Sequence, residues 1–159
     1  MRNPFRQNPV SPRLERIRTL SLFVDLSPGE LRLVEGLMHE RSYLANEVIF
    51  DEGEEGHAIY IVLDGEVSIT RTIGDKTSEI ARLGVGTFFG ELALLDGAPR
   101  SADARALNDV RLAVFFREDF LELLDTHGRV ASKIARQLAR HIGGRMREMA
   151  MAVGAYQHL

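Results

Sequence analysis

The chain has 159 residues, with 20 Lys and Arg against 23 Asp and Glu, and a formal net charge of −3. This length fits one domain, and a hydrophobic content of 45% is enough to build a buried core. The slight acidic excess argues against a protein whose whole surface binds nucleic acid. The absence of cysteine excludes disulfides, thiolate metal sites and cysteine nucleophiles.

The N-terminal region carries no targeting or membrane signal. No apolar run reaches the roughly 18 residues of a transmembrane helix, and residues 1–12 lack the apolar region of a secretory signal. We therefore expect no membrane span and a cytoplasmic location. Pro4, Pro9 and Pro12 predict a flexible arm over residues 1–12.

Helical signals follow this arm. Apolar spacing predicts a first helix around residues 13–20. A second helix is expected to start at Ser27, which can cap it, with Pro28 at the first helical position. Glu30 then completes a capping box with Ser27.

From about residue 41 to residue 116 the hydrophobic period changes to two. Many short strands at spacings of about 8–12 residues, separated by Gly- and Asp-rich turns, are typical of a β sandwich, jelly roll or barrel. The apolar runs are Val48–Phe50, Ile59–Leu63, Val67–Ile69, Ile80–Leu83 and Val110–Val114.

The helical period returns after residue 116. A short helix is predicted over residues 118–124, with a break at His127 and Gly128, and a long helix over residues 129–151. The apolar positions of the long helix recur every four residues, so they drift around its surface. Part of this helix can pack on the β strands while another part faces a partner protein or a second copy of the chain.

The segment from Phe88 to Ala106 carries the chemistry. Gly90–Leu95 predicts a glycine-led helical turn, whose unpaired backbone N–H groups suit an anion. Arg100 follows a Gly-Ala-Pro turn and can pair bidentately with a phosphate. Glu91 would repel that phosphate, so its presence needs another purpose, such as accepting a hydrogen bond from a sugar hydroxyl.

This segment resembles the phosphate-binding cassette of the cyclic nucleotide-binding domain family. That family includes the catabolite activator protein, the kinase regulatory subunit and cyclic nucleotide-gated channels. Two motifs in the same order carry the resemblance, which spans about residues 14–150. They are the Gly-spaced hairpin and apolar strand of Val48–Gly65, and the pair Phe89–Leu94 with Arg100–Ala102.

The resemblance implies an α+β fold. In it, an antiparallel β jelly roll, or double-stranded β-helix, is flanked by N-terminal helices and by a hinge helix plus a long C-terminal helix. The expected domain covers residues 13–151, with the β roll at about 41–116, the hinge and C-terminal helices at about 117–151, and a tail at 152–159.

The resemblance also implies roles for individual residues. Glu91 would bind the ribose 2′-hydroxyl and Arg100 the cyclic phosphate. The other expected contacts are backbone groups of Gly90, Leu92, Ala93 and Ala102, and the hydroxyl of Ser101. Walls near the base would come from Ile69, Ala81 and Leu83, and the guanidinium of Arg145 could stack on a purine.

Each of these roles has a structural alternative. Glu91 and Arg100 could form an ion pair within the loop, and Ser101 could bond its own turn. Arg145 could lie on a solvated helix face. The three base-wall residues could serve the core alone. The histidines, including His141, show no metal-ligand spacing, so we expect no metal site.

The expected function is binding without catalysis. The sequence shows no acid–base pair of catalytic residues. It also shows no metal-binding set and no histidine pair, which hydrolysis of a cyclic phosphodiester normally needs. Few residues follow the long helix, so we expect no DNA binding in cis. We therefore predict a stand-alone sensor that binds cAMP, or cGMP, and no other cofactor. Its C-terminal helices would move on binding and so signal to a partner protein. The alternatives are a ligand-free interaction module and a receptor for cyclic di-GMP.

Overall fold

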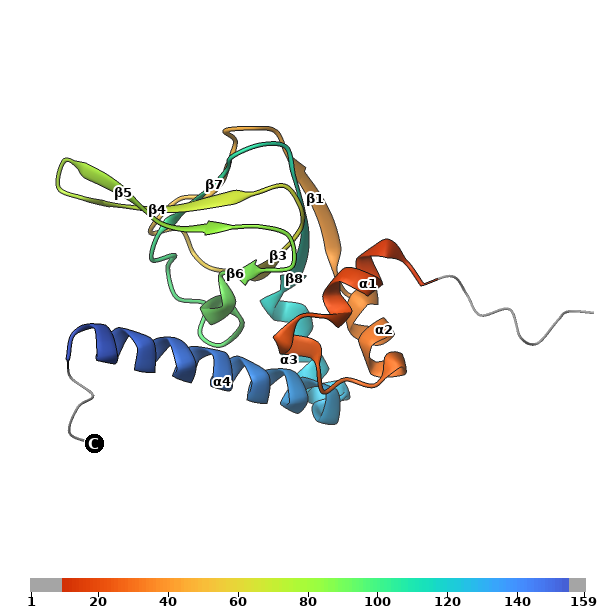
Figure 1. Cartoon of the computed structure of the whole chain (residues 1–159). Helices are drawn as coiled ribbons and strands as arrows, with labels where there is room; N and C mark the ends of the chain where they lie inside the picture. Colours follow the sequence, from red (N-terminus) through yellow and green to blue (C-terminus); the bar gives the residue numbers. More distant parts are fainter. Residues whose placement is uncertain (1–9, 155–159) are drawn as a thin grey trace, which may run out of the picture.

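Two four-stranded antiparallel sheets form the centre of the computed structural model, which describes residues 10–154 (Figure 1). The strands are β1 (His39–Tyr43), β2 (Val48–Phe50), β3 (Ala58–Asp64), β4 (Val67–Ile73), β5 (Lys76–Leu83), β6 (Phe88–Phe89), β7 (Asp103–Ala106) and β8 (Val110–Phe116). One sheet has the order β1-β8-β3-β6 and the other β2-β7-β4-β5. The predicted α+β fold with an antiparallel jelly roll is confirmed.

The central strand β3 shows why these residues form a sheet with two covered faces. All of its residues except Asp64 are buried. Because successive side chains of a strand point to opposite faces, Ile59, Ile61 and Leu63 enter the core beneath the helices. Tyr60 and Val62 enter a second core enclosed by the two sheets. One face of the β3 sheet therefore packs against the other sheet, and its opposite face packs against the helices.

The helices surround one side of this roll (Figure 1). They are α1 (Pro12–Arg18), the 3-10 turn η1 (Ser21–Phe23), α2 (Pro28–Gly36), the 3-10 turn η2 (Glu91–Leu94), α3 (Arg117–Thr126) and α4 (Gly128–Ala152). The capping box predicted for α2 is confirmed, since Ser27 Oγ accepts from Glu30 N and Glu30 Oε1 accepts from Ser27 N.

The first helix begins one residue earlier than expected. Ser11 caps it by accepting a hydrogen bond from Leu14 N at 3.0 Å, and Pro12 occupies its first turn. Proline suits this position because a backbone N–H group in the first turn of a helix has no partner in the helix, so its absence in proline costs nothing there. Pro12 thus belongs to α1, whereas residues 1–9 of the predicted arm, and residues 155–159 of the predicted tail, lie outside the described residues.

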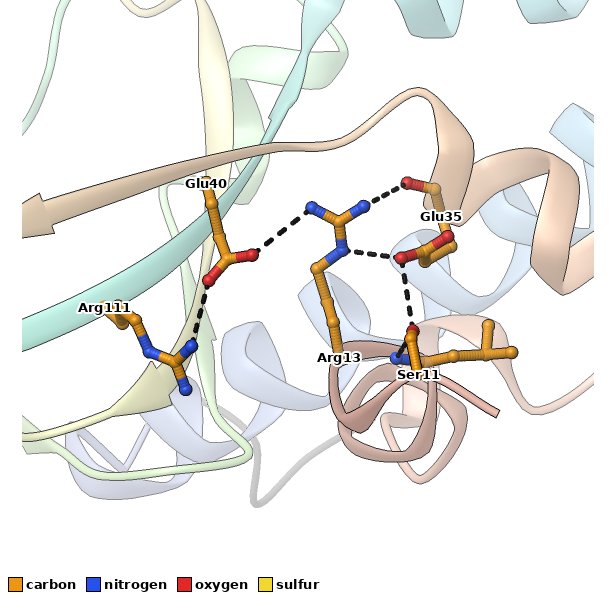
Figure 2. A network of polar contacts seen from close by, with 6 residues as sticks. Ser11, Arg13, Glu35, Glu40 and Arg111 are labelled. Atoms are coloured by element: carbon orange, nitrogen blue, oxygen red, sulfur yellow. Dashed lines mark hydrogen bonds and ion pairs between the residues drawn. The ribbon is translucent and has the colours of Figure 1, made fainter. Parts of the chain in front are cut away.

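An ion-pair network ties the N-terminal helices to the roll (Figure 2). Arg13 Nε donates to Glu35 Oε1 at 2.7 Å, and its Nη1 lies 3.6 Å from a carboxylate oxygen of Glu40. Arg111, on β8, donates to the other oxygen of Glu40 at 3.2 Å. Ser11 also reaches Glu35. The network therefore joins α1 to the end of α2 and to the β1–β8 pair.

The break predicted between the last two helices is confirmed at His127, which ends α3 and precedes α4 with φ −136° and ψ 58°. In Figure 1, α4 runs from α3 past the η2 turn. Its 25 residues correspond to a length of about 37 Å. Within residues 10–154, no helix has both the length and the apolar character needed to cross a membrane.

Candidate functional site

The predicted glycine-led turn connects β6 to the loop before β7. Gly90 has φ 73° and ψ 21° and is followed by the single turn η2. A Cβ atom at this position would lie 2.5 Å from Arg100 Nη1 and 3.3 Å from the carbonyl oxygen of Ala58. Glycine is therefore required both by the left-handed backbone and by the close approach of the arginine.

Arg100 is a buried cation beneath this turn. Only 8% of the residue is exposed. Its Nη2 donates to the carbonyl oxygen of Ala58 at 2.9 Å, and its Nη1 to that of Gly90 at 3.3 Å. The guanidinium carbon lies 4.2 Å from the ring centroid of Phe50 and 5.5 Å from that of Tyr60. These contacts fix the side chain in place without neutralising its charge.

The electrostatics of Arg100 leave room for an anion. Burial lowers its pKa, an effect opposed by neighbouring groups that include the Glu54 and Glu91 carboxylates. None of the described carboxylates forms an ion pair with it. Buried charges are normally paired because desolvation is costly. A phosphate would supply the missing partner through charge-assisted hydrogen bonds.

The Gly-spaced hairpin supports the loop that carries Arg100. Gly53 N donates to the carbonyl oxygen of Arg100 at 2.8 Å, and Arg100 N donates to that of Glu54 at 2.7 Å. Gly56 N donates to the carbonyl oxygen of Ala98 at 3.2 Å. The two sequence motifs that carry the resemblance are therefore parts of one backbone-bonded corner.

Glu91, the first residue of η2, faces the C-terminal helix. The residue is 5% exposed. Its Oε1 accepts a hydrogen bond from Arg145 Nη1 at 2.8 Å and lies 3.4 Å from His141 Nε2. Glu91 thus pairs with α4 and not with Arg100, so the alternative of a structural Glu91–Arg100 pair is wrong.

The remaining predicted residues lie around this corner or on the neighbouring hairpin. Ala93 and Ala102 are buried, while Leu92 and Ser101 are exposed. Within residues 10–154, Ser101 makes no recorded side-chain hydrogen bond, so the turn-hydroxyl alternative has no support. On the hairpin, half-buried Ile69 is paired with Ala81, and Leu83 with Val67. Ile69 and Leu83 also pack against the second core.

Arg145 lies partly in one of its two predicted environments. Its side chain is 62% exposed, yet its guanidinium is bonded to Glu91. The predicted solvated face therefore describes most of this side chain but not its contact with Glu91, and the predicted stacking on a purine stays a prediction.

Sequence reasoning missed several residues of the site. The aromatic rings beneath Arg100 belong to Phe50 and Tyr60, which lie within the Val48–Gly65 motif but on strands of different sheets, and which meet in the core between the two sheets. His141 was set aside because it lacks metal-ligand spacing. Its position four residues before Arg145 places the two side chains on the same helix face, and this spacing is the signal that could have linked His141 to the site.

A depression at the N-terminal helices has a volume of about 300 Å³ and a lining that includes Arg13, Arg16, Glu40 and Arg111, but neither Arg100 nor Glu91. Arg13 and Arg111 there are paired with carboxylates (Figure 2). It therefore suits an anion less well than Arg100 does. No group of three His, Cys, Asp or Glu residues that could hold a metal ion occurs within residues 10–154.

Comparisons with known proteins show which family and which folds the chain is similar to. The family model of the cyclic nucleotide-binding domain matches residues 40–127. The cyclic AMP receptor protein of Thermus thermophilus is 40% identical over 122 residues, which make up 76% of this chain and 56% of that protein. The chain thus spans about half the length of this relative.

Two solved structures extend the similarity to the fold. The catabolite activator protein of Thermus thermophilus has a TM-score of 0.77 and 37% identity, and the match covers 84% of this chain and 62% of that one. The regulatory domain of Toxoplasma gondii PKA, solved with cAMP, has a TM-score of 0.66 and 31% identity, covering 70% and 42% of the two chains.

Proposed function

Because this chain belongs to the cyclic nucleotide-binding domain family, we propose that it binds a cyclic mononucleotide, with cAMP preferred, at the corner formed by Arg100 and Glu91. The observation that carries the proposal is the buried guanidinium of Arg100, which is fixed by two carbonyl oxygens and two aromatic rings and has no carboxylate partner among the described residues. The cyclic phosphate supplies that partner. A ligand-free interaction module would gain nothing from such an arrangement.

The other predicted residues complete the ligand contacts. Glu91 accepts a hydrogen bond from the ribose 2′-hydroxyl. Backbone groups of Gly90, Leu92, Ala93 and Ala102 and the hydroxyl of Ser101 surround the phosphate, and Ile69, Ala81 and Leu83 form a wall near the base.

The preference for cAMP draws on two similar proteins, a cyclic AMP receptor protein and a PKA regulatory domain solved with cAMP. Cyclic GMP is the nearest competitor, because the phosphate and ribose contacts do not depend on the base. Cyclic di-GMP carries two phosphates, whereas the corner offers one buried, unpaired arginine. It is therefore the least suitable of the three ligands.

The proposed output is a signal to a protein partner in the cytoplasm, with no catalysis and no DNA contact by the chain itself. The helices α3 and α4 have two alternative arrangements, and ligand binding shifts the population toward the one in which the ligand makes additional contacts. The exposed Met146, Met149 and Met151 of α4 provide apolar surface for that partner or for a second copy of the chain. If amide hydrogen exchange over residues 117–150 is the same with and without saturating cAMP, this part of the proposal fails.

The binding proposal is tested by calorimetry with cAMP, cGMP and cyclic di-GMP. Arg100→Ala should weaken binding by about 2–5 kcal/mol, the usual cost of removing one member of a buried charge pair. Arg105→Ala is the matched control, since Arg105 is exposed on the adjacent strand β7 and bonds only a backbone carbonyl in the described structure. Arg105→Ala should bind normally.

A second variant guards against misfolding. Arg100→Lys keeps the charge but loses the planar fork that binds two oxygens at once, so it should bind with intermediate affinity. Thermal unfolding of each variant shows whether the roll is intact. Unchanged cAMP affinity in folded Arg100→Ala, or no binding of any of the three ligands by the unaltered chain, contradicts the proposal.

A further inference from the structure

The two oxygens of the Glu91 carboxylate have different surroundings. Both contacts from α4, those of Arg145 and His141, are made with Oε1. Oε2 accepts no hydrogen bond within residues 10–154. Within the same residues, the one fully buried side-chain nitrogen or oxygen without a hydrogen-bond partner is Nε of Arg117. Because Oε2 also has no partner, it is not fully buried. Among the two oxygens, Oε2 is therefore the one without a hydrogen-bond partner in the described residues, and it keeps some exposure to solvent.

The helix places the two basic side chains side by side for this contact. His141 and Arg145 are four residues apart and so lie on one face of α4. The imidazole of His141 also packs on Phe88 of β6, with ring centroids 4.7 Å apart. It thus contacts both the strand before the glycine turn and the carboxylate after it.

This contact is the last polar connection between α4 and the rest of the described chain. The others recorded come earlier on the helix, from Lys133 to Glu30 and from Gln137 to Asp25. Beyond Arg145, Met146, Met149 and Met151 are all exposed. Apart from Ile142, which packs against the core beneath the helices, and His141, which packs on Phe88, the contact with Glu91 is therefore what holds the second half of α4.

We infer that His141 and Arg145 are positioning residues, which hold Oε1 of Glu91 from α4 so that Oε2 meets the ribose 2′-hydroxyl of the ligand. This inference rests on the proposed function and specifies how the site is connected to the helix. Glu91 then has two partners at once, the ligand on one oxygen and α4 on the other. The 2′-hydroxyl is thereby the ligand group that the second half of α4 senses.

The physical reason is the burial of the carboxylate. An ionised group that is 5% exposed needs a charged or hydrogen-bonding partner to offset desolvation. The guanidinium of Arg145 provides one and fixes the carboxylate rotamer, so that Oε2 is presented in one direction. Without Arg145, Glu91 loses the contact that orients it, and the hydrogen bond to the ribose hydroxyl weakens.

The test compares cAMP with 2′-deoxy-cAMP, which lacks only this hydroxyl. A hydrogen bond to a charged group should give the unaltered chain a preference for cAMP of about 10- to 100-fold. Arg145→Met should reduce that preference at least several-fold while leaving the affinity for 2′-deoxy-cAMP nearly unchanged. Arg145→Lys, which keeps a cation in reach of Oε1, should restore part of the preference.

Two further variants complete the test. His141→Phe keeps a ring against Phe88 and removes Nε2, so it should reduce the preference by less than Arg145→Met, in line with the longer contact. Arg147→Met is the matched control. It changes the helix charge equally, but Arg147 makes no recorded contact with Glu91 within residues 10–154, so the preference should stay.

Hydrogen exchange gives a second measure of the same connection. In the unaltered chain, cAMP should protect amides of residues 141–152 more than 2′-deoxy-cAMP does, and Arg145→Met should abolish the difference.

Two outcomes overturn the inference while leaving ligand binding at Arg100 standing. The unaltered chain could bind both ligands equally, or Arg145→Met could leave the preference unchanged. In the second case, an equal loss of affinity for both ligands would indicate a contact of Arg145 with the base. If the unaltered chain binds no cyclic nucleotide, the proposed function and this inference fall together.

Discussion

The two halves of α4 are attached to the β roll by different kinds of contact. In the first half, Val130, Ala131, Ile134 and Leu138 are buried in the core beneath the helices. In the second half, three methionines are 66–70% exposed, and Ile142 packs only partly buried against that core. The polar attachment of this half is the contact of His141 and Arg145 with Glu91. One helix thus combines an apolar anchor with a polar connection to the candidate site.

The difference bears on how a bound ligand would act on the helix under the proposed function. Apolar burial is non-directional. A hydrogen bond or ion pair to a carboxylate of the site depends on where that carboxylate points. The contact with Glu91 therefore links the second half of α4 directly to the candidate site.

The largest expected effect comes from weakening the anchor. Ile134 is fully buried, so Ile134→Ala should destabilise the fold by about 2–5 kcal/mol through lost burial and the cavity left behind. Met149→Ala, in the exposed half, should change stability by no more than about 0.5 kcal/mol. Denaturant unfolding measures both. Equal losses would mean that the two halves are packed alike.

A smaller effect is expected at the turn that the second half contacts. Gly90→Ala places a Cβ atom 2.5 Å from Arg100 Nη1 and forces alanine into the left-handed region, at a cost of about 1–2 kcal/mol. Because the guanidinium must move away, cAMP affinity should fall along with stability. Calorimetry and thermal unfolding measure the two effects. Normal affinity would show that the position of Arg100 is not critical for the ligand.

Features set by nearby residues were predictable from the sequence. The capping box of Ser27 and Glu30 and the glycine-led turn at Gly90 depend on residues at most a few positions apart. The alternation of β3 likewise indicated a strand, because its side chains divide between two cores. Arg100 was singled out by its place between a turn and a strand.

Contacts between distant segments were not predictable in this way. Arg145 and Glu91 are 54 residues apart, and their contact depends on where α3 directs the start of α4. The rings of Phe50 and Tyr60 beneath Arg100 depend on how the two sheets face each other. Neither spacing nor residue type fixes such relationships, so the sequence predicts neither the contact of Arg145 with Glu91 nor a role for His141.

The junction between the two halves of α4 gives a third prediction. Gly144 lies in the helix directly before Arg145, and a Cβ atom there would meet nothing within 4 Å. Gly144→Ala should therefore stabilise the protein by about 0.5–1 kcal/mol through the higher helix propensity of alanine. It should also slow amide exchange in residues 141–152. Destabilisation would show that the glycine serves a close approach that the structure does not contain.

The smallest effect concerns a polar contact of the anchored half. Lys133 Nζ donates to Glu30 Oε1 at 2.7 Å. Hydrogen bonds from Lys133 and from the backbone of Ser27 lower the pKa of Glu30 from 4.5 to about 2. Because the folded pKa lies below the unfolded one, this carboxylate stabilises the fold above about pH 4.5, and the contribution is lost as the pH falls to about 2.

Lys133→Met removes the main cause of that shift and tests this dependence. The variant should be slightly less stable than the unaltered chain at neutral pH, and the gap should close as the pH falls from about 4.5 to about 2. Arg136→Met, an exposed cation three residues along the same helix, is the control and should show no such closing gap. Thermal unfolding across this pH range measures both. Parallel curves for Lys133→Met would mean that the Lys133–Glu30 contact does not help to hold the first half of α4, which would leave apolar burial and the Gln137–Asp25 hydrogen bond as its attachments.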